Sequence, residues 1–358
     1  MSASELARVP RASIAAAQRE TMDRVVSIEI VRVTERTAVA AAQWRGRGNE
    51  KAADQAAVEA MWRELNRLPF AGSVVIGEGE RDEAPMLFVG EQVGARKGPK
   101  VDIAVAPLEG KTLCAKALPG AITAMAMSEG GALLNVPDVY MEKIAIGPGY
   151  PAGIVDLDAK PEHNIHALAM AKGVKAHEIT ALILDRPRHA DLIAAVRRTG
   201  AAVQLISDGD IAGVIHTADP ETTGVDIYVG VGGAPEGVLA AAALRCIGGQ
   251  FQGRLILDSE PKRAQARRLG IRDPKKRYVL EDLVHGDCVF AATGVVSGSM
   301  LRGVRFRPGV IETETVVMRS VTGTVRWIRA EHRKFEKFQM ESGGARVSVL
   351  QPGPRADL

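Results

Sequence analysis

The sequence predicts an α/β protein with two lobes, and three observations support this prediction. The chain has 358 residues, whereas single hydrophobic cores stop growing near ~250–300 residues. Runs rich in Val, Ile and Leu alternate with helical patterns of ten or more residues, as in βα units. Several of these runs end in acidic or glycine-rich turns, where ligands bind in such sheets.

The composition is that of a globular enzyme. Apolar residues make up 46% of the chain and charged residues 25%, which excludes a disordered or fibrous protein. The 46 basic and 43 acidic side chains leave a net charge of only +3. This charge is too small to indicate a nucleic acid or a membrane as a partner, so we expect neither.

We expect a cytoplasmic protein. No apolar stretch approaches the ~20 residues needed to span a bilayer, and no apolar run follows the first basic residues as in a secretory signal. The three cysteines, Cys114, Cys246 and Cys288, do not have the spacing of metal ligands. We interpret them as reduced and structural.

Two helices are expected in the first part of the chain, at residues 24–42 and 54–65, because apolar residues recur there at helical spacing. A turn at residues 46–49 separates them. Asp54 lies near the start of the second helix, where a carboxylate suits either the helix dipole or a bound cation. The helical pattern leaves both explanations open.

Two short β-like runs in this part each deliver a carboxylate at the carboxyl end of a strand. Residues 73–76 lead into Gly77 and Glu78, and residues 101–105 lead into a turn that contains Glu109. We therefore expect both glutamates at the sheet edge where ligands bind.

The second half repeats the alternation of strands and helices. Two short antiparallel strands rich in Thr and Val follow, and the highly charged segment before them is most simply a solvated helix and loop. The expected strands are 181–184, 202–206, 226–231, 310–321 and 324–329, the expected helices are 190–198 and 235–246, and the charged segment is 261–276.

Five acidic residues could converge at one edge of such a sheet. They are Asp54, Glu78, Asp82, Glu109 and Glu236. Clustered carboxylates repel one another unless cations neutralise them, and ligands with only oxygen donors favour Mg²⁺ or Mn²⁺. Such a centre suits hydrolysis of a phosphate ester. Spacing alone equally allows ordinary surface acids.

A glycine-rich segment in the second half is a candidate anion site. Gly-Gly-Ala-Pro-Glu-Gly at residues 232–237 follows a strand and opens a helix, so its backbone amides and the positive helix end can hold a phosphate. The glycine spacing differs from that of a dinucleotide-binding motif.

Two further groups follow strands. Arg186 and Arg188, on either side of Pro187, suit a bidentate phosphate clamp, although helix capping and surface charge explain them as well. Asp208 and Asp210 flank Gly209 and could accept hydrogen bonds from sugar hydroxyls, although the same tripeptide is also an ordinary turn.

Together these motifs resemble those of the class II fructose-1,6-bisphosphatases of bacteria. The resemblance rests on residues 76–86, 138–143, 186–189, 208–210 and 232–237, in the family's order, and it extends over about residues 24–332. It implies the sugar-phosphatase fold of the lithium-sensitive, magnesium-dependent phosphatases, a layered αβαβα sandwich. It also implies hydrolysis of the 1-phosphate of fructose-1,6-bisphosphate and, in some members, action on sedoheptulose-1,7-bisphosphate.

The resemblance also assigns roles to residues. It implies Mg²⁺ or Mn²⁺ at Asp54, Glu78, Glu109 and Glu236, with Asp82 beside the attacking water, and it implies that Tyr140, Arg186, Arg188, Asp208, Asp210 and amides near Gly233 hold the sugar and its non-reacting phosphate. It further implies a homo-oligomer, a dimer or a tetramer, and lobes at residues 24–160 for the metals and 161–335 for the sugar phosphate, with an extension at 1–23 and a tail at 336–358.

The sequence departs from the family at its second metal motif. The family has Asp-Pro-Leu-Glu-Gly-Thr, or Ile in place of Leu, where this chain has Ala106 and Lys111 at the two ends. The alanine removes a metal ligand. A charged lysine cannot accept the hydrogen bond that the threonine accepts, and Thr112 would point away from the site on an extended segment.

We expect Lys111 to lie where a metal would and to pair with Glu78, Glu109 or Glu236. Catalysis by a centre with Glu78, Asp82 and Lys111 should then be impaired. The alternative is a catalytically silent relative that binds sugar phosphates or regulates an active paralogue. Asn49, where the family commonly has aspartate, keeps an oxygen that can form a turn.

Overall fold

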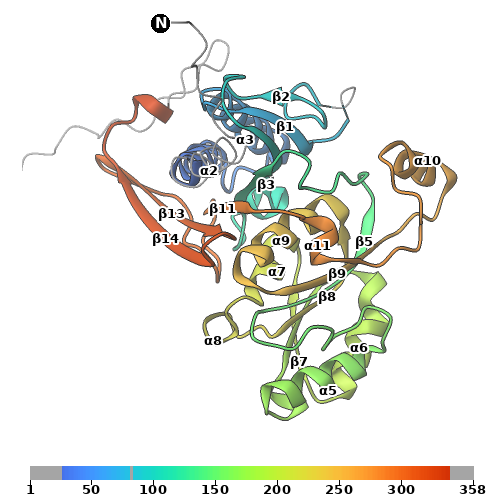
Figure 1. Cartoon of the computed structure of the whole chain (residues 1–358). Helices are drawn as coiled ribbons and strands as arrows, with labels where there is room; N and C mark the ends of the chain where they lie inside the picture. The colour runs from blue at the N-terminus through green and yellow to red at the C-terminus, as the bar shows by residue number, and fades with distance from the viewer. Residues whose placement is uncertain (1–25, 81–83, 339–358) are drawn as a thin grey trace, which may run out of the picture.

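The computed structural model describes residues 26–80 and 84–338. Two β-sheets and three helical layers alternate in space (Figure 1). The two sheets with helices on their faces form the layered α/β sandwich that the sequence predicts.

The first sheet has eight strands within the described residues, in the order β12-β13-β11-β4-β3-β1-β2, with β14 paired to β13. Only the pair β1 and β3 is parallel, and every other pair in this sheet is antiparallel. The strands are β1 (Ala71–Ile76), β2 (Gln92–Val93), β3 (Lys100–Glu109), β4 (Ile122–Glu129), β11 (Cys288–Gly294), β12 (Arg305–Arg307), β13 (Val310–Arg319) and β14 (Thr324–His332).

The second sheet has six strands within the described residues, in the order β10-β9-β5-β8-β6-β7. The pairs β6–β7 and β6–β8 are parallel, and the others are antiparallel. The strands are β5 (Tyr140–Ile146), β6 (Thr180–Leu184), β7 (Ala202–Ile206), β8 (Ile227–Gly233), β9 (Gln250–Leu255) and β10 (Tyr278–Val279).

Each helical layer has its own hydrophobic core. The pair α2 (Val26–Ala42) and α3 (Glu50–Leu65) covers the outer face of the first sheet. The helices α7 (Asp210–His216), α9 (Ala234–Ile247) and α11 (Leu280–Leu283) fill the space between the sheets. The pair α5 (Pro161–Lys172) and α6 (Ala190–Arg198) covers the outer face of the second sheet. The short helices α4 (Lys111–Ala115) and α8 (Pro220–Thr223) lie in connections.

The central strands β3, β4 and β11 of the first sheet are buried on both faces, because helices cover both. On β3, Val101 and Ile103 belong to the core under α2 and α3, whereas Ala104 faces the layer of α9. Successive side chains on a strand point to opposite faces, so a nearly continuous apolar run is required. The middle helix α9 is likewise buried on most of its sides.

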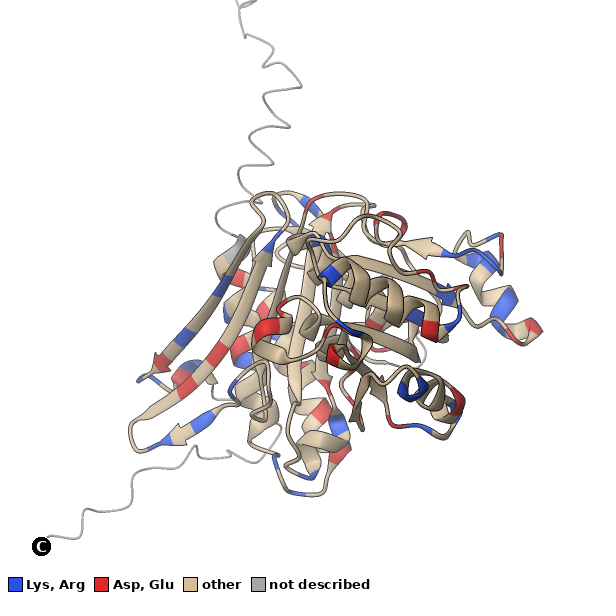
Figure 2. Ribbon diagram, turned by 90° about the horizontal axis from the view of Figure 1, so that it is seen from below, with Lys and Arg blue, Asp and Glu red and all other residues tan. Residues whose placement is uncertain are grey.

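The expected helices and strands are found close to their predicted bounds. Helix α6 and strand β7 coincide with the predicted 190–198 and 202–206, and β13 and β14 are antiparallel neighbours. The charged segment begins with α10 (Glu260–Arg268), which projects from the body of the molecule and carries several Lys and Arg positions, blue in Figure 2 (Figures 1 and 2). This confirms the prediction of a solvated helix.

The sheets do not follow the expected lobe boundary at residue 160. Strand β5 precedes that boundary but lies in the second sheet, and β11 to β14 follow it but return to the first sheet. Residues 130–287 are therefore an excursion between β4 and β11, which pair directly, with Ser128 opposite Cys288.

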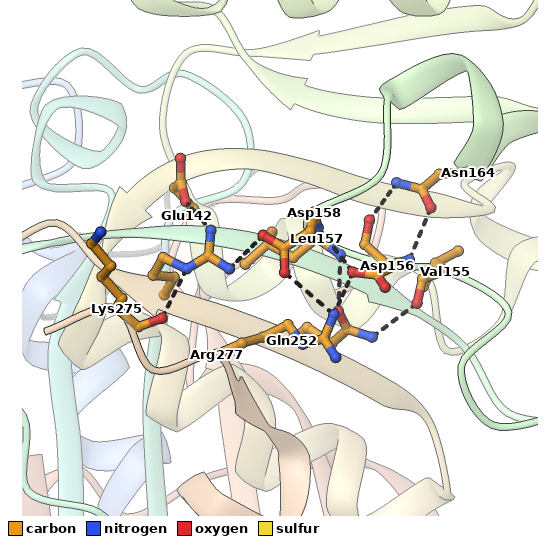
Figure 3. Close-up of polar contacts among 10 residues, drawn as sticks. Glu142, Val155, Asp156, Leu157, Asp158, Asn164, Gln252, Lys275 and Arg277 are labelled. Carbon is orange, nitrogen blue, oxygen red and sulfur yellow. Dashed lines mark hydrogen bonds and ion pairs between the residues drawn. The ribbon is translucent and has the colours of Figure 1, made fainter. Parts of the chain in front are cut away.

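Polar side chains fix the connection after β5 to the second sheet. Gln252 on β9 donates its amide to the carbonyl of Val155 at 2.8 Å and accepts from the backbone N–H of Leu157 at 2.9 Å (Figure 3). Beside it, Arg277 pairs with Asp156 and Asp158. These contacts of Gln252 and Arg277 hold the connection after β5 in place, although it contains no helix or strand.

No helix in residues 26–80 and 84–338 combines the length and the apolar character needed to cross a membrane.

Candidate active site

Glu78 and Glu109 reach the same edge of the first sheet because β1 and β3 run parallel. Glu78 lies two residues beyond the end of β1, and Glu109 is the last residue of β3. Glu236, in the first turn of α9, completes a group of three glutamates that line one pocket of about 240 Å³ together with Lys111 and Ala106. The predicted convergence of these three glutamates is thus found in the structure.

Lys111 is the centre of the charge pattern in this pocket. Its Nζ donates hydrogen bonds to Oδ2 of Asp54 at 2.8 Å and to Oε2 of Glu78 at 3.3 Å. The expected pairing with Glu78 is present, whereas Glu109 and Glu236 do not pair with Lys111. The partner that was not expected, Asp54, is brought in by α3.

The turn after β3 explains how Lys111 reaches these carboxylates. Gly110 has a φ of 84°, in the left-handed region that favours glycine. The chain therefore turns sharply, and Lys111 becomes the first residue of the short helix α4. The expectation that Thr112 lies on an extended segment is wrong, because it belongs to this helix.

Burial is the main cause of the raised pKa of each of the three glutamates. It raises the pKa of Glu78, and the Lys111 ammonium opposes this rise. Burial raises the pKa of Glu109 well above its usual range, and the nearby Glu236 raises it further. Burial also raises the pKa of Glu236, partly offset by the positive charge of Lys143. Close carboxylates with little solvent disfavour the charged state.

The carboxylates do not form a ready metal centre. In residues 26–80 and 84–338 no group of three or more His, Cys, Asp or Glu side chains is arranged to hold an ion. The Lys111 ammonium occupies the place between Asp54 and Glu78, and Ala106 offers no carboxylate. One oxygen, Oδ1 of Asp54, is buried and has no hydrogen-bond partner among the described residues. This oxygen alone does not complete a coordination shell, so the residues do not fit the metal set that the family resemblance implies.

Asp82 lies outside the described residues. Asn49 caps α3, because its Oδ1 accepts from the backbone N–H of Ala52 at 3.0 Å. The expectation that this asparagine keeps a turn-forming oxygen is confirmed.

Three of the residues expected to hold the sugar, Tyr140, Arg188 and Gly233, lie together at the amino-terminal end of β5. Tyr140 is the first residue of β5, and Gly233 is its partner in register on β8. The guanidinium of Arg188 lies 4.8 Å from the centre of the Tyr140 ring and donates to the carbonyl of Val231 at 2.8 Å. Tyr140 is half exposed, so its ring is accessible beside an arginine.

The two aspartates of the Asp-Gly-Asp tripeptide have different environments. Oδ1 of Asp208 accepts from the N–H of Gly209 at 2.9 Å, as in an ordinary turn. Asp210 is buried and accepts from the ammonium of Lys143 and the hydroxyl of Tyr228. Within the described part of the chain, the side chain of Arg186 bonds locally, to the carbonyl of Asp185 at 3.0 Å.

Lys143 is fully buried, and it is the main residue of this region for which no role was predicted. Besides Asp210, its Nζ donates to the carbonyl of Gly233 at 2.6 Å. Lys143 lies on the same face of the apolar strand β5 as Met141 and Ala145. This pattern could have indicated that its charge is buried. Lys143 thus connects α7 to the start of α9.

The glycine at position 233 leaves open the space that the Glu236 carboxylate occupies. A Cβ at this position would lie 1.8 Å from Oε2 of Glu236. The glycine-rich turn thus makes room for a carboxylate, in addition to any role of its amides toward an anion.

A layered α/β sandwich with a pocket of buried glutamates at the ends of parallel strands defines a sugar-phosphatase type of protein. A family model described as bacterial fructose-1,6-bisphosphatase, glpX-encoded, matches residues 24–332, and the chain belongs to this family.

Curated relatives from cyanobacteria agree with this assignment. Two proteins of Synechococcus, strains JA-3-3Ab and JA-2-3B'a(2-13), are each 44% identical to the chain over 338 residues, and one of Trichodesmium erythraeum is 41% identical over 336 residues. Each alignment covers 87% of this chain and 97% of the relative. All three are named D-fructose 1,6-bisphosphatase class 2/sedoheptulose 1,7-bisphosphatase.

Proposed function

We propose that the chain hydrolyses the 1-phosphate of fructose-1,6-bisphosphate, with sedoheptulose-1,7-bisphosphate as a second substrate. The observation that carries the proposal is the single pocket into which Glu78, Glu109, Lys111 and Glu236 converge. The names of the cyanobacterial relatives give the substrate class.

The proposed roles of the residues divide between the two ends of the substrate. Tyr140, Arg186 and Arg188 bind the sugar and its non-reacting phosphate, with the amide of Gly233 and the carboxylate of Asp208 as further partners. The arginine guanidiniums suit a phosphate dianion. We propose that Asp210, whose carboxylate already accepts from Lys143 and Tyr228, acts by holding its neighbours.

The reacting phosphate lies toward the glutamates and Lys111. The ammonium attracts the phosphoryl oxygens and stabilises negative charge that develops on them. Asp54 and Glu78 orient this ammonium, and Asp82 remains the proposed partner of the attacking water.

We propose Mg²⁺ or Mn²⁺ as the cofactor, bound only weakly, because Ala106 removes a ligand and Lys111 must leave its place between Asp54 and Glu78 before an ion can enter. When bound, such an ion polarises the phosphoryl group and lowers the pKa of a water molecule. Loss of part of this assistance should cost several powers of ten in rate.

We also propose a cytoplasmic homo-oligomer, a dimer or a tetramer. The three cysteines are buried free thiols, which suits a reducing compartment. Analytical ultracentrifugation of the whole chain measures the oligomeric state.

Phosphate release from fructose-1,6-bisphosphate tests the proposed activity. The chain is compared with the double variant Ala106→Asp and Lys111→Thr, which restores the family motif. We expect slow release by the chain and release at least a hundredfold faster by the variant. Equal rates would contradict the impairment. Binding without release by either protein would favour the silent sugar-phosphate-binding alternative.

A further inference from the structure

Three separate elements bring the Lys111 cluster together. Asp54 comes from α3, Glu78 from the loop after β1, and Lys111 from the turn after β3. A surface ion pair would not need such convergence. The ammonium therefore belongs to the construction of the pocket and compensates two of the carboxylates that would otherwise repel one another.

The ammonium group has one donor more than these two carboxylates use. A lysine has three N–H donors, and two of them bond to Asp54 and Glu78. The Lys111 side chain is 45% exposed and lines the pocket. One N–H is thus left for a ligand that enters from solvent.

The same position excludes a divalent cation. An ion that coordinated both Asp54 and Glu78 would have to lie within a few ångströms of Nζ, where like charges repel strongly at low dielectric. The neighbouring Ala106 lines the pocket without offering a ligand. A metal at this place therefore requires that Lys111 move out.

We propose that the Lys111 ammonium is a resident cation, which replaces a divalent metal between Asp54 and Glu78 and binds the phosphate group of a sugar phosphate without any metal. The ligand class rests on the proposed function. A phosphate dianion suits the free N–H because lysine binds phosphates as a point charge.

Calorimetric titration of the whole chain in excess EDTA tests the proposal, with fructose-1,6-bisphosphate and inorganic phosphate as probes. The key variant is Lys111→Met, which keeps the length of the side chain and removes its charge. Lys116→Met is the matched control, because Lys116 is an exposed lysine at the end of the same helix α4.

We expect the chain and the Lys116→Met variant to bind fructose-1,6-bisphosphate equally in EDTA. The Lys111→Met variant should bind roughly tenfold or more weakly, the effect of one charge-assisted hydrogen bond. Equal metal-free binding by the Lys111→Met variant and the chain would overturn the proposal. So would a failure of the chain itself to bind in EDTA.

A titration with Mn²⁺, followed by electron paramagnetic resonance, gives an independent readout. We expect the Lys111→Met variant, and more strongly its combination with Ala106→Asp, to bind at least one Mn²⁺ more per chain than the unmodified protein. If the variants and the unmodified protein bind equal numbers of Mn²⁺ ions, the proposal that Lys111 takes the place of a metal is overturned. Thermal melts show whether the variants are folded, and if Lys111→Met is not, Lys111→Thr takes its place.

The proposal and the proposed function can fail separately. Absence of phosphate release together with metal-free binding that needs Lys111 would refute the activity and keep the resident cation. Phosphate release together with metal-free binding that does not need Lys111 would refute the resident cation and keep the proposed activity.

Discussion

Lys111 and Asp54 are 57 residues apart in the sequence, yet Nζ of the lysine lies 2.8 Å from Oδ2 of the aspartate. The hydrogen bond connects the turn after β3 to helix α3, which belongs to the layer of helices on the first sheet. This contact therefore affects both the stability of the fold and ligand binding, and substitutions of the surrounding residues can test both effects.

Replacement of Asp54 by Asn should loosen Lys111 while leaving α3 intact. Among the described residues the ammonium keeps Glu78 as a charged partner, so we expect a loss of about 0.5–1 kcal/mol in stability, since Lys111 is partly exposed and solvent screens the pair. Urea denaturation measures this loss. The same substitution in a Lys111→Met background should have a smaller effect, and an undiminished effect would mean that the pair does not interact.

Replacement of Lys143 by Met should destabilise the second sheet strongly. The Asp210 carboxylate would remain buried with only Tyr228 as a partner, and breaking a buried ion pair costs about 3–5 kcal/mol. The double variant with Asp210→Asn should recover part of this loss, because no unpaired charge is left. Urea denaturation of the three proteins forms the test, and a loss below about 1 kcal/mol in the single variant would contradict the network.

Replacement of Gly233 by Ala should displace the Glu236 carboxylate, since the new Cβ would lie 1.8 Å from its Oε2. We expect at least a tenfold loss of phosphate release with little change in melting temperature. Gly130→Ala is the control, because a Cβ there has no neighbour closer than 3.6 Å. Equal activity of the two variants would argue against a role for the position of Glu236.

Replacement of Gln252 by Ala should free the connection after β5 from the second sheet (Figure 3). Two hydrogen bonds are lost, and each contributes about 0.5–1.5 kcal/mol. Hydrogen exchange at the amide of Leu157 should speed up in the variant. Gln204→Ala, on the edge strand β7, should leave this amide unchanged.

His332 should make stability depend on pH. Burial, and to a lesser extent Lys337 and Arg36, lower the pKa of His332 to about 4. The neutral ring accepts from Nζ of Lys337 at 2.8 Å on Nδ1, and its Nε2 lies 2.9 Å from Oγ1 of Thr313. The unfolded chain binds the proton near pH 6.5. The stability from this residue is therefore complete above pH 6.5 and is lost as the pH falls toward 4.

The size of the His332 effect should be about 2–3 kcal/mol between these pH values. The variant His332→Gln should have a flatter stability profile, whereas His163→Gln, at an exposed position, should follow the unmodified protein. Urea denaturation at several pH values measures the three profiles. Parallel profiles for the protein and His332→Gln would exclude this histidine as the cause.

Much of the fold could be predicted because local patterns determine it. The apolar periodicity indicated α6 and β7, and the acidic turns after β1 and β3 placed Glu78 and Glu109 at one sheet edge. Such local patterns do not predict to which of the two sheets a strand belongs. Neither the sequence of β5 nor that of β11 indicates its sheet, which depends on how the strands pack around α9 between the sheets.

The three glutamates and Lys111 that line the pocket could be predicted from the sequence, but their contacts could be predicted less well. The charge of Lys111 near Glu78 could be expected from the altered motif, but its hydrogen bond to Asp54 depends on how α3 packs. Glu109 accepts instead from the backbone N–H of Ile211 at 3.2 Å, a contact between segments that no spacing relates. Lys143 shows the same limit, because a buried charge is explained only by partners on other elements.

The excursion of residues 130–287 between β4 and β11 has a consequence for synthesis on the ribosome. The edge of β4 that pairs with β11 has no partner until Cys288–Gly294 has left the exit tunnel. During that interval the nascent chain exposes an unpaired, apolar strand edge, which is the kind of surface that promotes aggregation. Chaperone binding to stalled chains should therefore peak before residue 288 emerges and decline once β11 has docked.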